Sequence, residues 1–305
     1  MWLRRRDTDD VSEQFQSRVE TLSDGTSLRI VDWSTTENSG GTPILLVHGL
    51  ASNARLWDGP ARALRKSGHQ VIAVDLRGHG LSDKPDSGYS PVEVARDIVE
   101  VIESHVRRDP RWHRPLVIGQ SWGGNIVVEL AARHPEVVRG IVAVDGGTIE
   151  LSHSFPTWEE CERTLRPPAL SGMPYDRLRA YIAAAHPDWS DEAIDGQMHN
   201  MQRHPDGTVS ARLALAHHMV ILRHLWEHLP SRHWTSMKVP VLFTPATKPQ
   251  DGHVELKRRQ IAEALAAIPR ARVEWFEPAD HDLHAQHPDR FAAVVDHAIS
   301  TGFFS

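Results

Sequence analysis

The segment from Pro115 to Arg133 constrains the fold more than any other part of the chain. An apolar run, Pro115 to Ile118, is typical of a buried strand, and a helical pattern follows from Ile126 to Arg133. Gly119-x-Ser121-x-Gly123 lies between them. The glycines are needed because side chains two positions before and after a serine on so sharp a turn would collide with the strand and the helix. The pattern predicts a strand–turn–helix that presents the Ser121 hydroxyl beside helix N–H groups.

Other short apolar runs alternate with helical patterns along the chain, which is typical of an α/β fold. A hairpin, Ser17–Leu22 with Ser27–Trp33, precedes them. The further predicted strands are Pro43–Val47, Val71–Asp75, Ile141–Asp145, Pro240–Thr244 and Arg272–Phe276. Together with the strand before Ser121 they predict a mostly parallel eight-stranded sheet with helices on both faces.

The continuous apolar runs stop between residues 148 and 235, where only amphipathic patterns remain. The predicted helices are Trp158–Leu165, Tyr175–Ala185, Asp191–Arg203 and Val209–His228. The last two are separated by His204-Pro205-Asp206-Gly207, which we interpret as a helix break. We therefore expect an all-helical insertion over residues 148–235, between two parts of one α/β core, residues 1–147 and 236–305.

Composition excludes some classes of protein. The net charge of −6 over 305 residues gives no reason to expect a nucleic-acid partner. A single cysteine, Cys161, excludes an internal disulfide bond and favours the cytoplasm. No apolar run is long enough to cross a membrane, and the arginines near Met1 are not followed by the apolar core of a secretory signal.

Polar residues follow several of the predicted strands, where the carboxyl ends of parallel strands form a binding edge. Ser121 and Asp145 are two of them. A serine hydroxyl needs a base to become a nucleophile, and the base needs an orienting carboxylate. In this fold pattern the base follows the last strand, and we select His281 from the 20 histidines because it lies in the loop after Phe276. His284 and His287 lie where the chain enters the last helix, and we expect them to be surface or capping residues.

Four sequence motifs of the chain resemble the α/β-hydrolase superfamily, in the group of cap-bearing esterases, lactonases and carbon–carbon-bond hydrolases. The motifs are Val47-His48-Gly49-Leu50, Asp75-x-Arg77-Gly78-His79-Gly80-x-Ser82, Gly119-Gln120-Ser121-Trp122-Gly123-Gly124, and His281 before Pro288-Asp289. The resemblance implies an α/β-hydrolase fold with a helical cap and no cofactor or metal. It also implies an oxyanion hole formed by the backbone N–H groups of Leu50 and Trp122, with structural roles for His48, Asp75, Arg77 and Ser82.

The acidic member of a triad is where the chain departs from this family. Most relatives carry an aspartate about four residues past the strand equivalent to Pro240–Thr244, and Lys248 occupies that place here. Asp145 is our first candidate, because it ends the strand that follows the Ser121 helix. Asp251 is the second, and its alternative role is to cap the next helix.

Two histidines of the insertion, His224 and His228, have a spacing that can bind zinc. No acidic ligand is patterned with them, so we interpret them as one solvated helix face and predict no metal site.

The favoured activity is cleavage of a carboxylic ester or lactone, a small and partly apolar molecule, through an acyl-enzyme on Ser121. Hydrolysis of a carbon–carbon bond and acyl transfer use the same residues, and removal of N-terminal residues from peptides is disfavoured because the acidic pairs of the insertion look like helix starts. Epoxide hydrolysis and dehalogenation are also disfavoured, because relatives with those activities carry an aspartate at the position of Ser121. The alternative of a different class is a ligand-binding protein on a hydrolase scaffold. We expect a monomer or a homodimer, by analogy with relatives alone.

Overall fold

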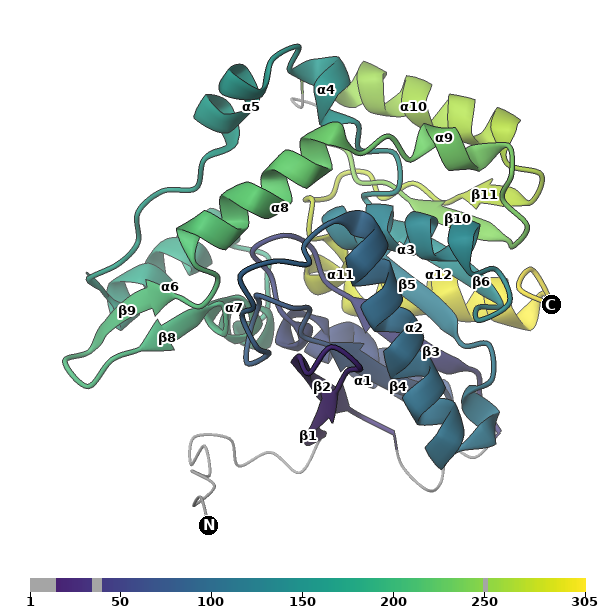
Figure 1. Cartoon of the computed structure of the whole chain (residues 1–305), viewed down its shortest axis with the longest axis horizontal. Coiled ribbons are helices and arrows are strands. Elements are labelled where there is room, and N and C mark those ends of the chain that lie inside the picture. Colours follow the sequence, from purple (N-terminus) through teal and green to yellow (C-terminus); the bar gives the residue numbers. More distant parts are fainter. Residues whose placement is uncertain (1–14, 35–39, 249–251) are drawn as a thin grey trace.

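The central element of the protein is a twisted eight-stranded sheet (Figure 1); the computed structural model describes residues 15–34, 40–248 and 252–305. The strand order is β1-β2-β4-β3-β5-β6-β10-β11. The strands are β1 (Gln16–Thr21), β2 (Ser27–Asp32), β3 (Pro43–Val47), β4 (Gln70–Val74), β5 (Leu116–Gln120), β6 (Gly140–Val144), β10 (Val241–Thr244) and β11 (Ala271–Val273). Pairing is parallel from β4 to β11 and antiparallel among β1, β2 and β4. The predicted mostly parallel sheet is confirmed.

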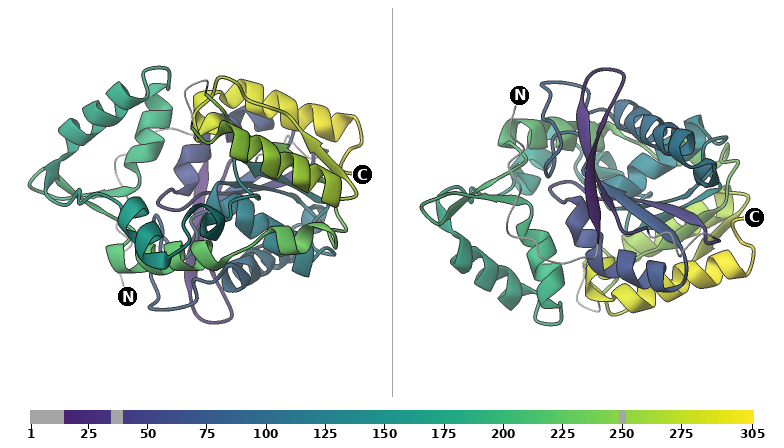
Figure 2. Two further views of the ribbon diagram at one scale, coloured as in Figure 1. Left: turned by 90° about the horizontal axis from the view of Figure 1, so that it is seen from above. Right: turned by 90° about the horizontal axis from the view of Figure 1, so that it is seen from below.

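Side chains of the central strands alternate between two apolar cores, one on each face of the sheet. In β3, Leu45 and Val47 enter one core, and Ile44 and Leu46 enter the other. Helices α2, α3 and α10 contribute to the first core, and α1 and α12 to the second, so both faces are covered (Figure 2). The core helices are α1 (Asp58–Lys66), α2 (Pro91–Arg108), α3 (Trp122–Arg133), α10 (Val254–Ala267), α11 (Leu283–Gln286) and α12 (Pro288–Ser300), with two short 3₁₀ helices, η1 (Ala54–Trp57) and η2 (Pro110–Trp112).

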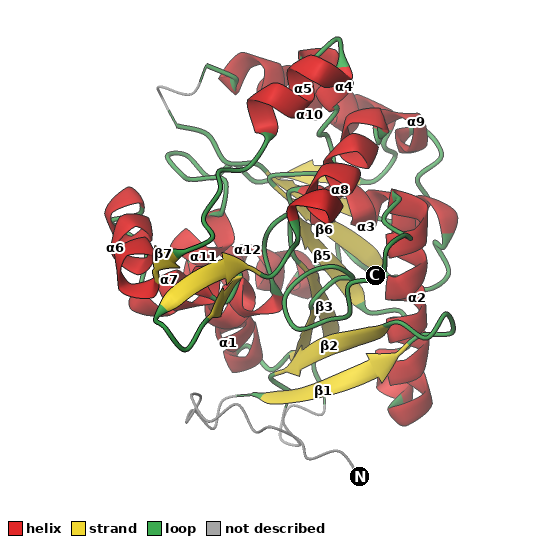
Figure 3. Ribbon diagram, turned by 60° about the vertical axis from the view of Figure 1, so that its left-hand side comes forward, coloured by secondary structure: helices red, strands yellow, loops and turns green. Residues whose placement is uncertain are grey.

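The segment between β6 and β10 forms a separate set of elements at the left and top of Figure 1. We call residues 148–235 the insertion. Its helices are α4 (Leu151–Ser154), α5 (Trp158–Leu165), α6 (Tyr175–Ala185), α7 (Asp191–Met198), α8 (Leu215–Glu227) and α9 (Ser231–Trp234). It also contains a three-stranded sheet in the order β7-β9-β8, formed by Met173–Pro174, Thr208–Ala211 and Met201–Arg203 (Figure 3).

The prediction of an all-helical insertion is therefore wrong at Met173–Pro174 and between residues 199 and 214. The helix expected over Asp191–Arg203 ends at Met198, and the helix expected over Val209–His228 begins only at Leu215. The intervening residues form a hairpin, in which β8 and β9 pair antiparallel. Its turn is stabilised by Asp206, whose carboxylate accepts hydrogen bonds from the N–H and hydroxyl of Thr208, and by Gly207 at φ +83°. Pro-Asp-Gly marks a strand turn here rather than a break between helices.

The sheet order places the ends of β5, β6 and β10 side by side, because β6 lies between the other two. Ser121 directly follows β5 and Asp145 directly follows β6. Across the residues that the structure describes, no helix combines the length and apolar character that a membrane crossing requires.

Candidate active site

The turn between β5 and α3 holds Ser121 in a strained backbone conformation. Its φ of +54° and ψ of −121° lie in a region that residues with side chains rarely adopt. A methyl group on Gly119 would clash with the carbonyl of Gly123, and one on Gly123 would lie 2.5 Å from the carbonyl oxygen of His48. Both glycines are thus required by close backbone approach, as the sequence predicted. The strand, turn and helix expected around Ser121 are all present.

His281 and Asp145 meet across the carboxyl edge of the sheet. Nδ1 of His281 lies 2.6 Å from Oδ2 of Asp145. Because an ionised carboxylate only accepts hydrogen bonds, Nδ1 carries the proton and Nε2 of the neutral ring is left as an acceptor. The His281 side chain is 52% exposed, whereas that of Asp145 is only 4% exposed. The pair is a base with one ring nitrogen fixed by a buried carboxylate, on a side chain that is half exposed.

Backbone contacts bring Ser121 into the same region. A methyl group on Gly146, the residue after Asp145, would clash with the Ser121 carbonyl, so the two loops are in close contact. The side-chain amide of Gln120 donates to the carbonyl of His281 at 3.4 Å, which links the turn to the histidine loop. Within the described part of the chain, neither Ser121 Oγ nor His281 Nε2 makes a hydrogen bond. Such contacts are often long before substrate binds.

Asp145 is held by two further groups. Its Oδ1 accepts from the N–H of Ala246 at 2.9 Å and from Nζ of Lys257 at 2.7 Å, and Lys257 also lies 3.0 Å from Oδ2. Burial by itself would raise the pKa of Asp145, but the hydrogen bonds and positive charges of His281 and Lys257 outweigh it and hold the pKa below its usual value. Desolvation likewise opposes the charged form of His281, and the hydrogen bond and charge of Asp145 outweigh it, so its pKa is raised.

The two backbone amides expected to form an oxyanion hole belong to Leu50 and Trp122. Within the described residues, neither N–H donates a hydrogen bond. His48 orients the first of them: its Nδ1 donates to the carbonyl of Gly49 at 2.7 Å, while its Nε2 accepts from the N–H of Leu76. Since the carbonyl and N–H of a trans peptide point in opposite directions, fixing Gly49 O also fixes the N–H of Leu50. His48 thus has a structural position.

The other motif residues predicted to be structural hold neighbouring loops. Asp75 is fully buried and accepts hydrogen bonds from the N–H groups of Ala54 and Leu81. Arg77 forms a two-bond ion pair with Asp97, at 2.5 and 2.6 Å. Ser82 donates to the carbonyl of Asp75 at 2.5 Å. Their side chains are occupied in supporting the loop before the site.

A cavity of about 600 Å³ opens beside His281. Part of its wall is apolar and comes from Ile149, Leu151, Phe155, Leu165 and Leu256. Asp145 and Lys257 also line it. The chain thus provides space for a small, partly apolar molecule next to the histidine.

The remaining candidates around the loop have different places. Asp251 lies outside the described residues. Lys248, which stands where relatives carry an acid, forms an ion pair with Asp280.

His284 was expected at the surface, and this is wrong, because it is only 1% exposed. The centre of its ring lies 4.1 Å from that of Trp57, and burial lowers the pKa of His284 to about 3. His287 is the residue before α12, where a surface or capping role was expected, and its side chain is partly buried and makes no capping hydrogen bond.

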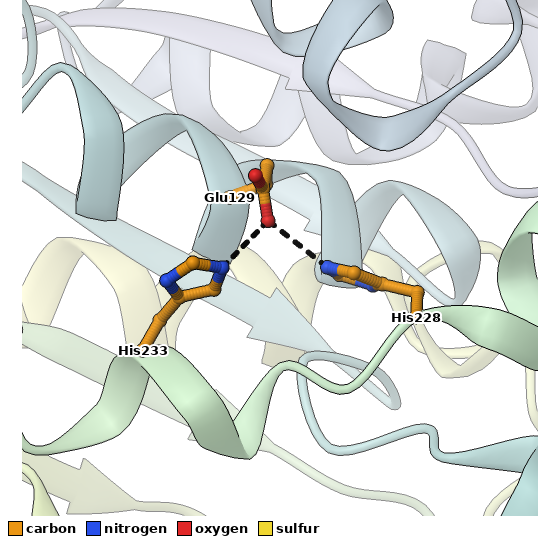
Figure 4. Close-up of side chains that lie close together, drawn as sticks. All are labelled: Glu129, His228 and His233. Atoms are coloured by element: carbon orange, nitrogen blue, oxygen red, sulfur yellow. Dashed lines mark hydrogen bonds and ion pairs between the residues drawn. The ribbon is translucent and has the colours of Figure 1, made fainter.

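A second histidine–carboxylate cluster lies on the other end of α3, and the sequence did not reveal it. Glu129 is buried between two histidines: its Oε2 lies 3.1 Å from Nε2 of His228 and 2.8 Å from Nε2 of His233 (Figure 4). Arg133 forms an ion pair with the other carboxylate oxygen. The expectation that His228 belongs to a solvated helix face is therefore wrong, because its side chain is 9% exposed and bonded to Glu129.

Glu129, His228 and His233 are close enough together to bind a metal ion, but the surroundings of His228 oppose it. Asn125 Oδ1 accepts from the N–H groups of Gly147 and Ile149, so its amide orientation is fixed. Its Nδ2 therefore faces Nδ1 of His228, at 3.3 Å, as a donor. Nε2 of His228 then carries the proton and donates to Glu129. A metal on Nε2 would require an acceptor opposite Nδ1 instead.

The residues that sequence reasoning missed are Lys257 and Glu129. Lys257 had no local signal, because it lies within an ordinary amphipathic helix, α10. A buried carboxylate on the expected apolar face of α3, eight positions after Ser121, was the available hint for Glu129.

Comparison with known proteins identifies the family of the chain. The profile of the alpha/beta hydrolase family matches residues 44–294. The chain therefore belongs to the alpha/beta hydrolase family. It is 27% identical over 274 residues to an uncharacterized protein of Mycobacterium tuberculosis, covering 86% of this chain and 76% of that one.

A shorter match, 37% identical over 109 residues, is to the 2-(acetamidomethylene)succinate hydrolase of Mesorhizobium japonicum, and it covers 36% of this chain and 37% of that one. Among solved structures, E-2-(acetamidomethylene)succinate hydrolase has a TM-score of 0.74 at 23% identity, covering 94% of this chain and 99% of that one. This likeness reflects the fold.

Proposed function

We propose that the protein is a cofactor-independent serine hydrolase that cleaves a carboxylic ester or lactone through an acyl-enzyme on Ser121. The observation that carries the proposal is the pairing of His281 with buried Asp145 beside the strained Ser121 turn. The proposed substrate is a small, partly apolar molecule, which suits the cavity beside His281. The insertion would act as a cap over this cavity, since Ile149, Leu151, Phe155 and Leu165 belong to it.

In the proposed mechanism, Ser121 Oγ attacks the carbonyl carbon while His281 Nε2 takes its proton. The N–H groups of Leu50 and Trp122 stabilise the oxyanion, each contributing about 3 kcal/mol. His281 then gives the proton to the alcohol, which leaves as the carbonyl re-forms on Ser121 Oγ. It next takes a proton from water as the water oxygen attacks the acyl carbon, and it gives this second proton to Ser121 Oγ as the bond to the acyl group breaks and the acid is released. Asp145 keeps the histidine in the required tautomer and stabilises its charged form.

Asp145, rather than Asp251, completes the triad in this proposal. Its support is the 2.6 Å contact with Nδ1 of His281. The same residues could cleave a carbon–carbon bond or transfer the acyl group to another nucleophile. We place the protein in the cytoplasm because its one cysteine, Cys161, is free. We further propose that it is a monomer or a homodimer.

The test is the burst of p-nitrophenol released from short- and medium-chain esters. Wild type should show a burst equal to the enzyme concentration, Ser121→Ala none, and Asp145→Asn a burst slowed by about 10³ to 10⁴. Asp251→Asn is the matched control and should behave as wild type. If wild type gives no burst and a fluorophosphonate does not label Ser121, the hydrolase proposal is wrong and the ligand-binding alternative replaces it. Loss of the burst in Asp251→Asn alone would move the acid to that loop.

A further inference from the structure

Lys257 contacts the Asp145 carboxylate although it belongs to none of the four sequence motifs of the family. It lies in the first turns of α10, and its Nζ contacts three oxygens: Asp145 Oδ1 at 2.7 Å, Asp145 Oδ2 at 3.0 Å and the carbonyl of Ala246 at 2.7 Å. An ammonium group has three protons, so its hydrogen-bonding capacity is filled. The side chain is 24% exposed, which makes these contacts largely shielded from water.

These contacts join two loops that come from neighbouring strands. Asp145 follows β6, and Ala246 follows β10, the strand after which relatives carry their acid. In this chain that loop supplies a backbone N–H to Asp145, and α10 supplies the ammonium group. Asp145 also has a φ of +40°, a conformation that needs support from its surroundings. Lys257 and Ala246 together occupy Oδ1, so that Oδ2 is directed at His281.

The charges around His281 differ in sign. Asp145 and Asp282 favour the charged imidazole, whereas desolvation and Lys257 oppose it. On the neighbouring segments, Asp280 is paired with Lys248 and lies 3.4 Å from His186. His284 is buried, and its ring packs against that of Trp57. Of the two lysines in this region, Lys257 is the one bonded to the carboxylate that His281 shares.

We propose that Lys257 is a positioning residue of the site: its ammonium group fixes the Asp145 carboxylate in line with His281 and neutralises part of its charge. This inference rests on the proposed function, in which His281 is the base. Because the ammonium group offsets part of the carboxylate charge, Asp145 can orient His281 while stabilising its charged imidazole less. The neutral form of His281, which acts as the base, then persists to lower pH.

Three substitutions separate the charge of Lys257 from its hydrogen bonds. Lys257→Met removes both, Lys257→Gln keeps a donor without the charge, and Lys257→Arg keeps both. Lys238→Met removes an exposed lysine charge elsewhere and is the control. The measured quantity is the second-order rate constant for labelling of Ser121 by a fluorophosphonate between pH 5 and 9. A parallel NMR titration follows the imidazole of His281.

We expect the acidic midpoint of labelling to move up by about half to one pH unit in Lys257→Met and Lys257→Gln. The direction follows from charge: without the ammonium group the protonated imidazole is stabilised more by Asp145. Lys257→Arg and Lys238→Met should keep the wild-type midpoint. The labelling rate at high pH should fall several-fold in Lys257→Met and recover in Lys257→Arg.

Unchanged midpoints in Lys257→Met and Lys257→Gln, by both labelling and NMR, would overturn the proposal and leave Lys257 a purely structural residue. An equal shift in Lys238→Met would also overturn it, because the effect would then come from net charge. If wild type is not labelled at all, the proposed function fails. The NMR titration of His281 still decides the role of Lys257 in that case.

Discussion

Two histidine–carboxylate clusters of this protein share the same parts but differ in what is left unbonded. In one, Asp145 contacts Lys257 and His281; in the other, Glu129 contacts Arg133, His228 and His233. Both carboxylates are buried and have a cation beside them. The clusters differ at the second ring nitrogen of the histidine, Nε2 in His281 and Nδ1 in His228.

Nε2 of His281 makes no hydrogen bond with any described residue, and its side chain is half exposed beside a cavity. Nδ1 of His228 accepts from Asn125, and its side chain is almost buried. A histidine can act as a base only through a nitrogen that is accessible and unprotonated. The first cluster is therefore equipped for proton transfer, whereas in the second both ring nitrogens of His228 are bonded, and His228 joins the end of α8 to α3. A carboxylate, a cation and a histidine do not by themselves indicate a catalytic site.

The same substitution in each cluster gives the largest contrast. We expect His281→Gln to reduce esterase activity about 10⁵-fold, because no other group can take the Ser121 proton. His228→Gln should keep activity within about threefold, since Gln can still donate to Glu129. Steady-state hydrolysis of a p-nitrophenyl ester measures both, with circular dichroism to verify folding. Similar losses in the two variants would contradict the distinction.

Removal of the carboxylate charge should affect stability at the second cluster. We expect Glu129→Gln to lower the free energy of unfolding by about 2–4 kcal/mol, because a buried charge is removed from two histidines and an arginine that surround it. Glu162→Gln is the matched control. Glu162 also pairs with an arginine four residues later, Arg166, but on an exposed helix, and should cost less than about 0.5 kcal/mol. Urea unfolding measures both, and equal losses would show that the burial of Glu129 has no consequence.

The same carboxylate predicts a dependence of stability on pH. Burial alone would raise the pKa of Glu129, but hydrogen bonds from His228, His233 and Arg133 outweigh it and hold the pKa far below its usual value. The ionised Glu129 carboxylate therefore makes its full contribution to the free energy of unfolding above its pKa in the unfolded chain, about 4.3. This contribution is lost as the pH falls towards the lower pKa of the folded protein. Between pH 6 and pH 3 we expect wild type to lose about 1.5–2 kcal/mol that Glu129→Gln does not lose. Parallel urea titrations test this, and identical slopes would contradict it.

How much of the fold and of the candidate site could be predicted from the sequence depends on how far apart in the chain the interacting residues lie. The Ser121 turn, the buried strands and the loop with His281 are each encoded in short local segments, and the structure has them close to where they are expected. The exception is the last strand, which was expected over Arg272–Phe276 and is Ala271–Val273 in the structure. The pairing of Asp145 with Lys257 spans 112 residues and exists because β10 lies beside β6 in the sheet. Nothing local in α10 indicates which of its three cationic residues, Lys257, Arg258 and Arg259, contacts a strand end.

In the insertion the sequence does contain a local signal, but this signal is compatible with two different structures. His204-Pro205-Asp206-Gly207 ends a helix as readily as it joins two strands. The outcome was decided by tertiary pairing, since β9 lies between β7 and β8 and Val209 is buried in a small cluster with Leu178 and Met198. Short strands of three or four residues have too little periodicity to be recognised without their partners.

The smallest expected effect concerns zinc at the second cluster. Because Asn125 faces Nδ1 of His228 as a donor, Nε2 carries the proton, and binding of zinc there would break the bonds to both Glu129 and Asn125. We expect 100 μM Zn²⁺ to change the unfolding temperature by less than about 1 °C, whereas a Kd below about 10 μM would raise it by about 2 °C or more. Differential scanning calorimetry of wild type and His228→Gln measures this. A rise in wild type that His228→Gln abolishes would mean that the Asn125 contact yields to the metal, and the cluster would then be a zinc site rather than a structural link between α8 and α3.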